Sequence, residues 1–204
     1  MIILDCEQGS EEWFEARCGI PTASCFDKIL TSTGKKSTQA KSYRYKLVAE
    51  YFTKEKVSAE QNEWMQRGVE MEAEARQYYE FMTSNKVQEV GLIYKNEDKL
   101  VSCSPDGLRE DRGLEIKCPA PHTHVEYLLN DKLPTKYIMQ VQGSMWVSGL
   151  DKWDFLSYHP AMPHLLITVE KDEALHEALD VALDAFIKTM LSEREQLEFR
   201  LANG

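Results

Sequence analysis

The chain has 204 residues, 43% of them hydrophobic, and a formal net charge of −10. A chain of this length buries one good core, and nothing in it requires a second domain, so we expect a single domain over residues 1–204. No apolar run approaches the roughly 18 residues that a membrane span needs, and the N-terminus lacks the basic flank and cleavage site of a signal peptide. We therefore expect a cytoplasmic protein without a membrane partner. The five cysteines are odd in number and follow no paired spacing, which argues against a disulfide framework.

The charges are unevenly distributed along the chain. A net negative charge argues against a nucleic-acid partner, because phosphate binding is largely electrostatic. Between Asp27 and Glu50, however, every charged side chain is basic, whereas acids crowd the stretch from Glu170 to Glu198. This pattern fits an acidic outer surface with a local basic mouth that admits a polyanion, and it also fits a solvated helix at each end.

The first part of the chain, to about residue 85, has the signals of helices. Ser10 is a possible N-cap of a short helix that Gly19 ends, and a segment that starts near Thr22 repeats the pattern with Gly34 as its stop. Two longer helices are expected near residues 37–53 and 61–82, where apolar side chains keep roughly helical spacing.

Short β-branched runs begin at Lys86. Strands are expected within 86–96, 99–104 and 113–119, broken by "NED", "PDG" and "EDRG". Pro134 then opens a helix that Gly149 closes, two further strands follow within 152–160 and 164–170, and an amphipathic helix covers about 172–198. The order predicts an α/β fold with a central mixed β-sheet flanked by helices: a helical part over about 1–85, a sheet core over about 86–170 and a C-terminal helix over about 171–200.

The stretch "CSPDGLREDRGLEIKCP", residues 103–119, carries charges in an apolar setting. Side chains alternate faces along a strand, so Glu115 and Lys117 project together. Asp106 follows Pro105, and we expect Gly107 to form the turn that brings its carboxylate alongside Glu115. Two nearby carboxylates repel unless a cation lies between them, and oxygen ligands suit Mg²⁺ or Mn²⁺, with the Ile116 carbonyl as a further ligand.

A simpler interpretation of this stretch stays open. Glu115 and Lys117 could form an ordinary ion pair on an exposed hairpin, contributing well under about 1 kcal/mol. Other segments favour the metal site: Glu72 lies in the middle of a helix, and Gln140 lies on a largely apolar helix. Arg17 is followed by "TAS", whose hydroxyls and backbone N–H groups at a helix start can bind phosphate.

Together these segments resemble a known family. The ordered set "W…R.GI.TAS", "G…E.EAR", "CSPDGL", "GLEIKCP" and "Y..QVQ.SMWV" resembles the bacteriophage lambda exonuclease family of the PD-(D/E)xK nuclease superfamily. The similarity runs in register from about Cys6 to Tyr158, while the loop after Leu30 and the C-terminal helix depart from it. The resemblance implies a restriction-endonuclease-like core.

The resemblance also implies an activity. Enzymes of this family depend on Mg²⁺, which Mn²⁺ can replace, and use two ions per active site. They digest the 5′-phosphorylated strand of linear duplex DNA processively from its 5′ end, release mononucleotides and leave 3′ single strands for phage recombination by single-strand annealing. They form ring-shaped homotrimers and work with a single-strand annealing protein. The implied setting is the cytoplasm of a bacterial host, with the gene carried by a phage or prophage.

The resemblance assigns roles to individual residues. Asp106, Glu115 and the Ile116 carbonyl would bind metal, and Glu72 would complete a second metal position. Lys117 would position and activate water with help from Gln140. The terminal 5′-phosphate would be bound by Arg17, Ser24 and Ser104. Met65 lies where the family has an apolar wedge that unpairs the DNA end, and Lys35 and Lys36 would contact the duplex backbone.

Two alternatives remain. The acid-acid-lysine core also occurs in restriction and repair endonucleases, which have no use for a terminal-phosphate pocket around Arg17. A structural zinc site in a nucleic-acid-binding module could instead use Cys103, Cys118, His122 and His124, although their spacing matches no usual zinc finger.

Overall fold

The first half of the chain is mainly helical. The computed structural model describes residues 1–55 and 63–204, with the backbone alone over 63–70. The elements of this half are β1 (Ile2–Leu4), α1 (Glu11–Arg17), the 3-10 helix η1 (Ala23–Lys28), α2 (Ala40–Thr53) and α3 (Glu63–Thr83). Ser10 caps α1 as predicted, because its side chain accepts a hydrogen bond from the backbone N–H of Trp13.

The strands form two sheets. β1 pairs with β2 (Leu92–Tyr94), which pairs with β3 (Ser102–Cys103), all antiparallel. The second sheet has the order β4 (Gly107–Leu108), β5 (Gly113–Lys117), β6 (Lys152–Ser157) and β7 (Leu165–Glu170). β5 and β6 run parallel and the other pairs antiparallel, so this sheet is mixed.

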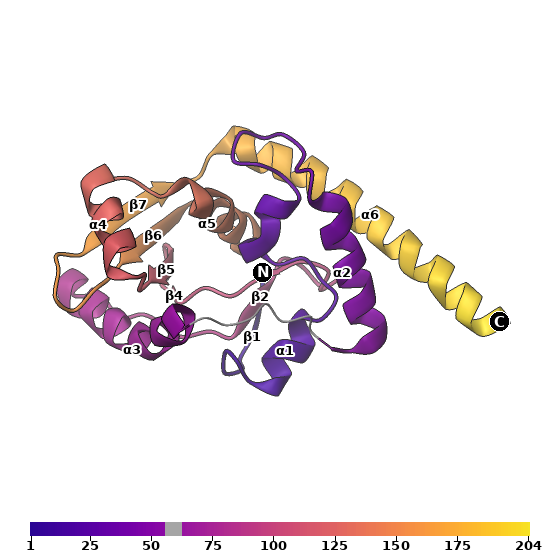
Figure 1. Ribbon diagram of the computed structural model, residues 1–204, viewed down its shortest axis with the longest axis horizontal. Helices are drawn as coiled ribbons and strands as arrows, with labels where there is room; N and C mark the ends of the chain where they lie inside the picture. The colour runs from indigo at the N-terminus through magenta and orange to yellow at the C-terminus, as the bar shows by residue number, and fades with distance from the viewer. Residues whose placement is uncertain (56–62) are drawn as a thin grey trace.

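Helices cover both faces of the mixed sheet. The crossover from β5 to β6 consists of α4 (Pro121–Asn130) and α5 (Thr135–Ser148). On one face, Val141 and Met145 of α5 pack against Trp153 and Phe155. On the other, Ala75 and Tyr79 of α3 pack against a set of apolar side chains: Leu114, Ile116, Cys118, Leu156 and Tyr158. Figure 1 shows the sheet between α3 and the α4–α5 pair, which confirms the predicted α/β architecture.

The long C-terminal helix joins α2 and α5. α6 (Glu173–Asn203) begins at Asp172, whose side chain accepts a hydrogen bond from the backbone N–H of Leu175. Its apolar side chains share the largest core with residues of η1, α2 and α5. In Figure 1 the C-terminal end of α6 extends beyond the rest of the molecule.

The structure corrects several expectations. There are two sheets in the described chain rather than one, and β1 and α4 were not predicted. The helix expected to run to Gly34 is the 3-10 helix η1, which ends at Lys28. Gly107 is a strand residue opposite Leu114 rather than a turn residue. Over the described ranges, no helix combines the length and the apolar character that crossing a membrane requires.

Candidate active site

The β4–β5 hairpin brings Asp106 to the strand that carries Glu115. Its turn lies at Arg109–Arg112, where the backbone N–H of Arg109 donates to the carbonyl of Arg112 over 2.8 Å. The backbone N–H of Asp106 donates to the Leu114 carbonyl at 3.0 Å. Its carboxylate accepts from the backbone N–H of Ile116 at 2.6 Å. The predicted proximity of Asp106 to Glu115 is therefore confirmed, although the turn is not at Gly107.

Glu115 is the buried centre of the site. Its side chain is fully buried, although it carries a carboxylate. One oxygen, Oε1, accepts a hydrogen bond from the Gln140 amide at 2.5 Å and forms an ion pair with Lys117. The other oxygen, Oε2, is buried and has no hydrogen-bond partner among the described residues. The predicted common face of Glu115 and Lys117 is confirmed, and Gln140 reaches it from α5.

Glu72 approaches from α3. Its carboxylate forms an ion pair with Arg76 at 2.7 Å and keeps 29% of its side-chain surface exposed. Arg76 in turn donates to the backbone carbonyl of Asp106 at 2.9 Å. The helix and the hairpin are therefore joined next to the acids, through an arginine that the sequence analysis did not single out.

The acids shift one another's pKa values. Burial and the neighbouring Asp106 raise the pKa of Glu72 to about 7. Burial, with Asp106 and Glu72, raises the pKa of Glu115 to about 8, against the opposing effect of Lys117. Burial also raises the pKa of Asp106. Burial is the largest cause of all three shifts, and neighbouring acids add to it for Glu72 and Glu115.

The pKa of Lys117 is raised although the side chain is partly buried. Burial alone would lower its pKa, but Glu115 and Asp106 together raise it above the usual lysine range. The side chain therefore stays an ammonium group, and it is a donor of hydrogen bonds rather than an acceptor of protons.

The donor set fits a hard divalent cation. Carboxylate oxygens are the ligands that Mg²⁺ prefers, and the unpartnered Oε2 of Glu115 together with the raised pKa values indicates where positive charge is missing. The acids do not yet enclose one point: in the described part of the chain, no three Asp, Glu, His or Cys side chains are close enough to hold one ion. The roles predicted for Glu72, Asp106, Glu115 and the Ile116 carbonyl as ligands stay predictions.

A second polar cluster surrounds Arg17. Its guanidinium lies 3.9 Å from the centre of the Trp13 ring and donates to the Thr22 hydroxyl at 3.4 Å. The Thr22 hydroxyl is 3.1 Å from that of Ser24, and the Trp13 indole N–H donates to Ser104 at 3.0 Å. The structure thus gathers all three side chains predicted for the phosphate pocket.

The chemistry of this cluster suits an anion. The Nε of Arg17 is buried, and none of the described residues forms a hydrogen bond with it. A half-buried guanidinium with an unused donor beside two hydroxyls can bind an anion through several charge-assisted hydrogen bonds. Ser104 lies two residues before Asp106, so the cluster adjoins the acidic site. Thr22 belongs to the "TAS" segment, whose hydroxyls the sequence analysis expects to bind phosphate. Trp13 was missed as a site residue, because an aromatic side chain gives no distinct signal.

Other predicted residues lie elsewhere. Lys35 and Lys36 are exposed on a loop near the start of α6, where a Cβ on Gly34 would lie 3.9 Å from that of Ala178. Their proposed contact with duplex DNA stays a prediction. Met65 falls within the backbone of α3, but its side chain lies outside the described residues.

The zinc alternative is wrong. Cys103 and Cys118 belong to different hydrophobic clusters. Both ring nitrogens of His124 already have partners, at 2.7 Å from the Ser157 hydroxyl and at 2.8 Å from the Pro163 carbonyl. These side chains therefore cannot converge on one ion without leaving their present contacts.

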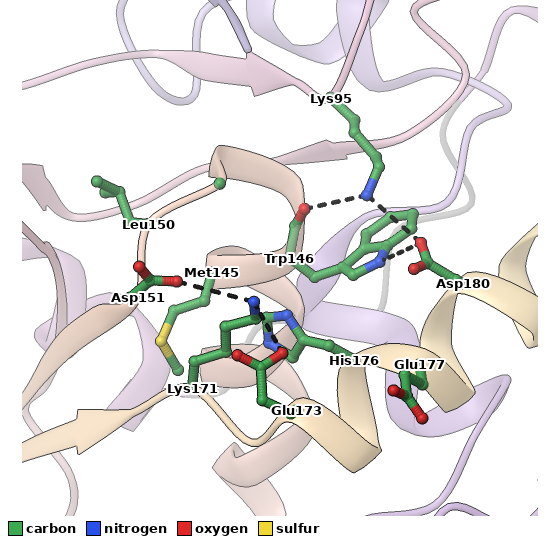
Figure 2. Close-up of a pocket in the computed structure, with 11 residues that line it drawn as sticks. Lys95, Met145, Trp146, Leu150, Asp151, Lys171, Glu173, His176, Glu177 and Asp180 are labelled. Carbon is green, nitrogen blue, oxygen red and sulfur yellow. Dashed lines mark hydrogen bonds and ion pairs between the residues drawn. The ribbon is translucent and has the colours of Figure 1, made fainter.

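A separate hollow between α5 and α6 contains none of the predicted site residues. Figure 2 shows two ion pairs within it: Lys95 with Asp180 at 3.7 Å, and Lys171 with Glu173 at 2.9 Å. Trp146 also donates its indole N–H to Asp180 at 2.7 Å. The charge of this hollow is thus largely satisfied, in contrast to that of the acidic site.

Comparison with known proteins gives one family and a closely similar fold. The family model of the YqaJ-like viral recombinase domain matches residues 12–151. The alkaline exonuclease LHK-Exo of Laribacter hongkongensis is similar with a TM-score of 0.84 and 34% sequence identity, over 95% of this chain and 99% of that one. Its structure in complex with dAMP gives a TM-score of 0.83 and 33% identity over the same shares.

Two further proteins match at lower sequence identity. A phage-related exonuclease of Haemophilus somnus 129PT shares the fold with a TM-score of 0.65 and 16% identity, over 85% of this chain and 96% of that one. An uncharacterised protein of Acanthamoeba polyphaga mimivirus is 28% identical over 110 residues, which are 47% of this chain and 20% of that protein. The chain thus matches about a fifth of the length of that viral relative.

The resemblance to phage-type exonucleases is confirmed by both kinds of match. The family model covers more than half of the chain, and LHK-Exo is similar over nearly the whole of both chains. The chain belongs to the YqaJ-like viral recombinase family and has the fold of an alkaline exonuclease.

Proposed function

We propose that this protein is a Mg²⁺-dependent deoxyribonuclease that digests one strand of linear duplex DNA from its 5′ end. The observation that carries the proposal is the contact of Glu115 with both Lys117 and Gln140, beside Asp106. The names of the similar proteins, an alkaline exonuclease and a viral recombinase domain, support this class of reaction.

The residues of the acidic site would have separate roles in the reaction. Asp106, Glu115 and Glu72 would hold two Mg²⁺ ions, or Mn²⁺ in their place, with the Ile116 carbonyl as a further ligand. When bound, these ions supply charge that polarises the scissile phosphate and lowers the pKa of water. Lys117, held as an ammonium group by two carboxylates, donates to a phosphoryl oxygen or to the attacking water. Gln140 holds the Glu115 carboxylate in place through its amide.

The Arg17 cluster accounts for the choice of end. We infer that Arg17, Ser24 and Ser104 bind the terminal 5′-phosphate, because a half-buried guanidinium with a free donor and nearby hydroxyls suits a phosphate dianion. Each cut releases a mononucleotide and creates a new terminal phosphate, which rebinds in this cluster. The same contact therefore explains both a 5′-to-3′ direction and processivity.

The assembly and the partner follow from the same proposal. A ring of three subunits would surround the duplex, and a single-strand annealing protein would take up the 3′ strand that digestion leaves. The family description, a viral recombinase domain, supports a role in phage recombination.

A substrate comparison tests the proposal. With Mg²⁺, we expect digestion of linear duplex with 5′-phosphate ends, slower digestion with 5′-hydroxyl ends, no cutting of closed circles, and no activity in EDTA. Release of mononucleotides from the 5′-labelled end is the direct readout. Cutting of closed circles at a similar rate would favour a restriction-type or repair-type endonuclease and would contradict the proposal.

A further inference from the structure

One arginine contacts three segments around the acidic site. Arg76 Nη2 donates to Oε1 of Glu72 at 2.7 Å, and its Nε donates to the backbone carbonyl of Asp106 at 2.9 Å. Its Nη1 forms an ion pair with Glu89 at 2.7 Å. Only 14% of the Arg76 side chain is exposed, whereas 72% of Glu89 is. All three nitrogens of the guanidinium are therefore engaged, two of them next to the acids.

The contact with Asp106 separates this arrangement from an ordinary helix pair. Glu72 and Arg76 are four residues apart, and such a pair on an exposed helix contributes only about 0.3 to 0.5 kcal/mol. Here the same guanidinium also holds a carbonyl that is 30 residues away along the chain. It thereby fixes α3 against the start of β4, with Glu72 and Asp106 at the two ends of one rigid group.

We propose that Arg76 is a positioning residue that fixes the carboxylate of Glu72 and the peptide of Asp106 for cation binding. This inference rests on the proposed function, since it assigns those acids to the metal site. A planar guanidinium holds two acceptors at a fixed angle, and one lysine ammonium cannot do the same at both. Residues that orient metal ligands typically affect metal affinity about 10- to 100-fold when they are changed. Glu89 completes the arrangement by holding the outer nitrogen.

Three variants separate positioning from charge. Arg76→Lys keeps the positive charge but loses the fork, while Arg76→Gln loses both. The matched control is Arg109→Gln, because Arg109 is similarly buried, with 18% of its side chain exposed, and pairs with Asp111 rather than with a candidate ligand. Binding of Mn²⁺ to the metal-free protein is measured by titration calorimetry. The Mg²⁺ concentration for half-maximal cleavage and the KM for DNA are measured in parallel.

We expect both Arg76 variants to weaken Mn²⁺ binding about tenfold and to raise the half-saturating Mg²⁺ concentration by a similar factor. The KM for DNA should be unchanged, most of kcat should return at saturating Mg²⁺, and Arg109→Gln should match the wild type. Wild-type Mn²⁺ affinity in Arg76→Lys would overturn the inference, because charge alone would then suffice.

Two further outcomes are distinguishable. If Arg76→Gln fails to fold, as judged by circular dichroism, Arg76→Lys and Glu89→Gln still decide the question. Glu89→Gln should weaken Mn²⁺ binding about two- to threefold, because it loosens only the outer nitrogen. If the wild type itself neither binds Mn²⁺ nor cleaves DNA, the proposed function fails. If the wild type does both and the Arg76 variants equal it, the inference about Arg76 alone fails.

Discussion

At the scale of residues, Glu115 is a fully buried carboxylate at the centre of the acidic site. A fully buried carboxylate is destabilising unless each oxygen has a partner, and here Oε2 has none in the described chain. Burial and the nearby acids raise its pKa to about 8. The unfolded chain releases the proton of this carboxyl near its ordinary pKa of 4.5, whereas the folded, metal-free protein holds it up to about pH 8.

This difference predicts how stability depends on pH. Between about pH 4.5 and 8 the folded state binds more protons than the unfolded state, so the free energy of unfolding falls as the pH rises. In EDTA, the Tm of the wild type should drop from pH 6 to pH 8.5 more than that of Glu115→Gln, and Mg²⁺ should recover more of it at pH 8.5. Thermal scans of both proteins give the comparison. Equal drops would mean that Glu115 does not titrate in this range.

Arg17 should contribute to the preference for 5′-phosphate ends. Arg17→Ala should reduce the preference for 5′-phosphate over 5′-hydroxyl ends by about tenfold, because a charge-assisted hydrogen bond is lost. Initial rates on the two substrates give the ratio. The control is Lys35→Ala with Lys36→Ala, since loop lysines that contact the backbone would weaken both substrates alike. An unchanged ratio in Arg17→Ala would remove Arg17 from the phosphate pocket.

The sequence alone predicts some of these site residues and misses others. The alternation of "EIK" was enough to place Glu115 and Lys117 on one face, because strand geometry is local. The contact with Gln140 spans 25 residues and was expected only from the family resemblance. Arg76 was missed because its pair with Glu72 resembles many exposed helix pairs, and its contact with Asp106 depends on how α3 packs on the sheet.

At the scale of elements, α5 decides how the site is held. It contacts strands of both sheets, as well as η1 and α6. Gly143 allows a close approach of α5 to η1: a Cβ there would lie 2.5 Å from Cδ2 of Phe26 and 3.4 Å from Cβ of Ala23. Phe26 is fully buried in the largest core. The position of Gln140, one turn earlier on α5, therefore depends on this contact.

Gly143→Ala should destabilise the protein by about 1 to 3 kcal/mol. Alanine is favoured over glycine in a helix by up to about 1 kcal/mol, but the overlap with the Phe26 ring outweighs this gain. Urea unfolding measures the difference, and Thr135→Ala at the exposed start of α5 should stay within about 0.5 kcal/mol of the wild type. A Gly143→Ala protein as stable as the wild type would show that the contact is not tight.

Elements with local signals were predicted, and elements that depend on distant partners were not. α5 has Pro134 before it and Gly149 after it in the left-handed conformation, with φ at 76°, as its sequence indicated. β1 is only three residues long and exists because β2 lies beside it, about 90 residues later. The division into two sheets likewise follows from the pairing of β2 with β1, which no local pattern specifies.

At the scale of the whole molecule, the acidic C-terminal stretch has a structural use. The carboxylate of Glu193 in α6 accepts hydrogen bonds from Nε and Nη2 of Arg44 at 2.8 and 2.9 Å. That of Glu198 accepts one from the Tyr51 hydroxyl at 2.8 Å. Part of the acidic charge thus holds α6 on α2 and neutralises a basic residue there. The charge pattern along the sequence therefore does not by itself show where DNA would bind.

The proposed ring predicts a mass. Three chains of 23.5 kDa give about 70 kDa (3 × 23.5), which sedimentation equilibrium should show at micromolar concentration. A single species of 23.5 kDa that still digests DNA processively would contradict the ring.

The most direct test of the central claim is the digestion rate of Lys117→Ala on linear duplex with 5′-phosphate ends and saturating Mg²⁺. Since Lys117 is the ammonium group held by Glu115 and Asp106, its loss should lower the single-turnover rate by about 10²-fold or more while the fold and DNA binding persist. Lys152→Ala, which changes an exposed lysine of β6, should digest at the wild-type rate. A Lys117→Ala rate within a few fold of the wild type would contradict the claim that this site cleaves DNA.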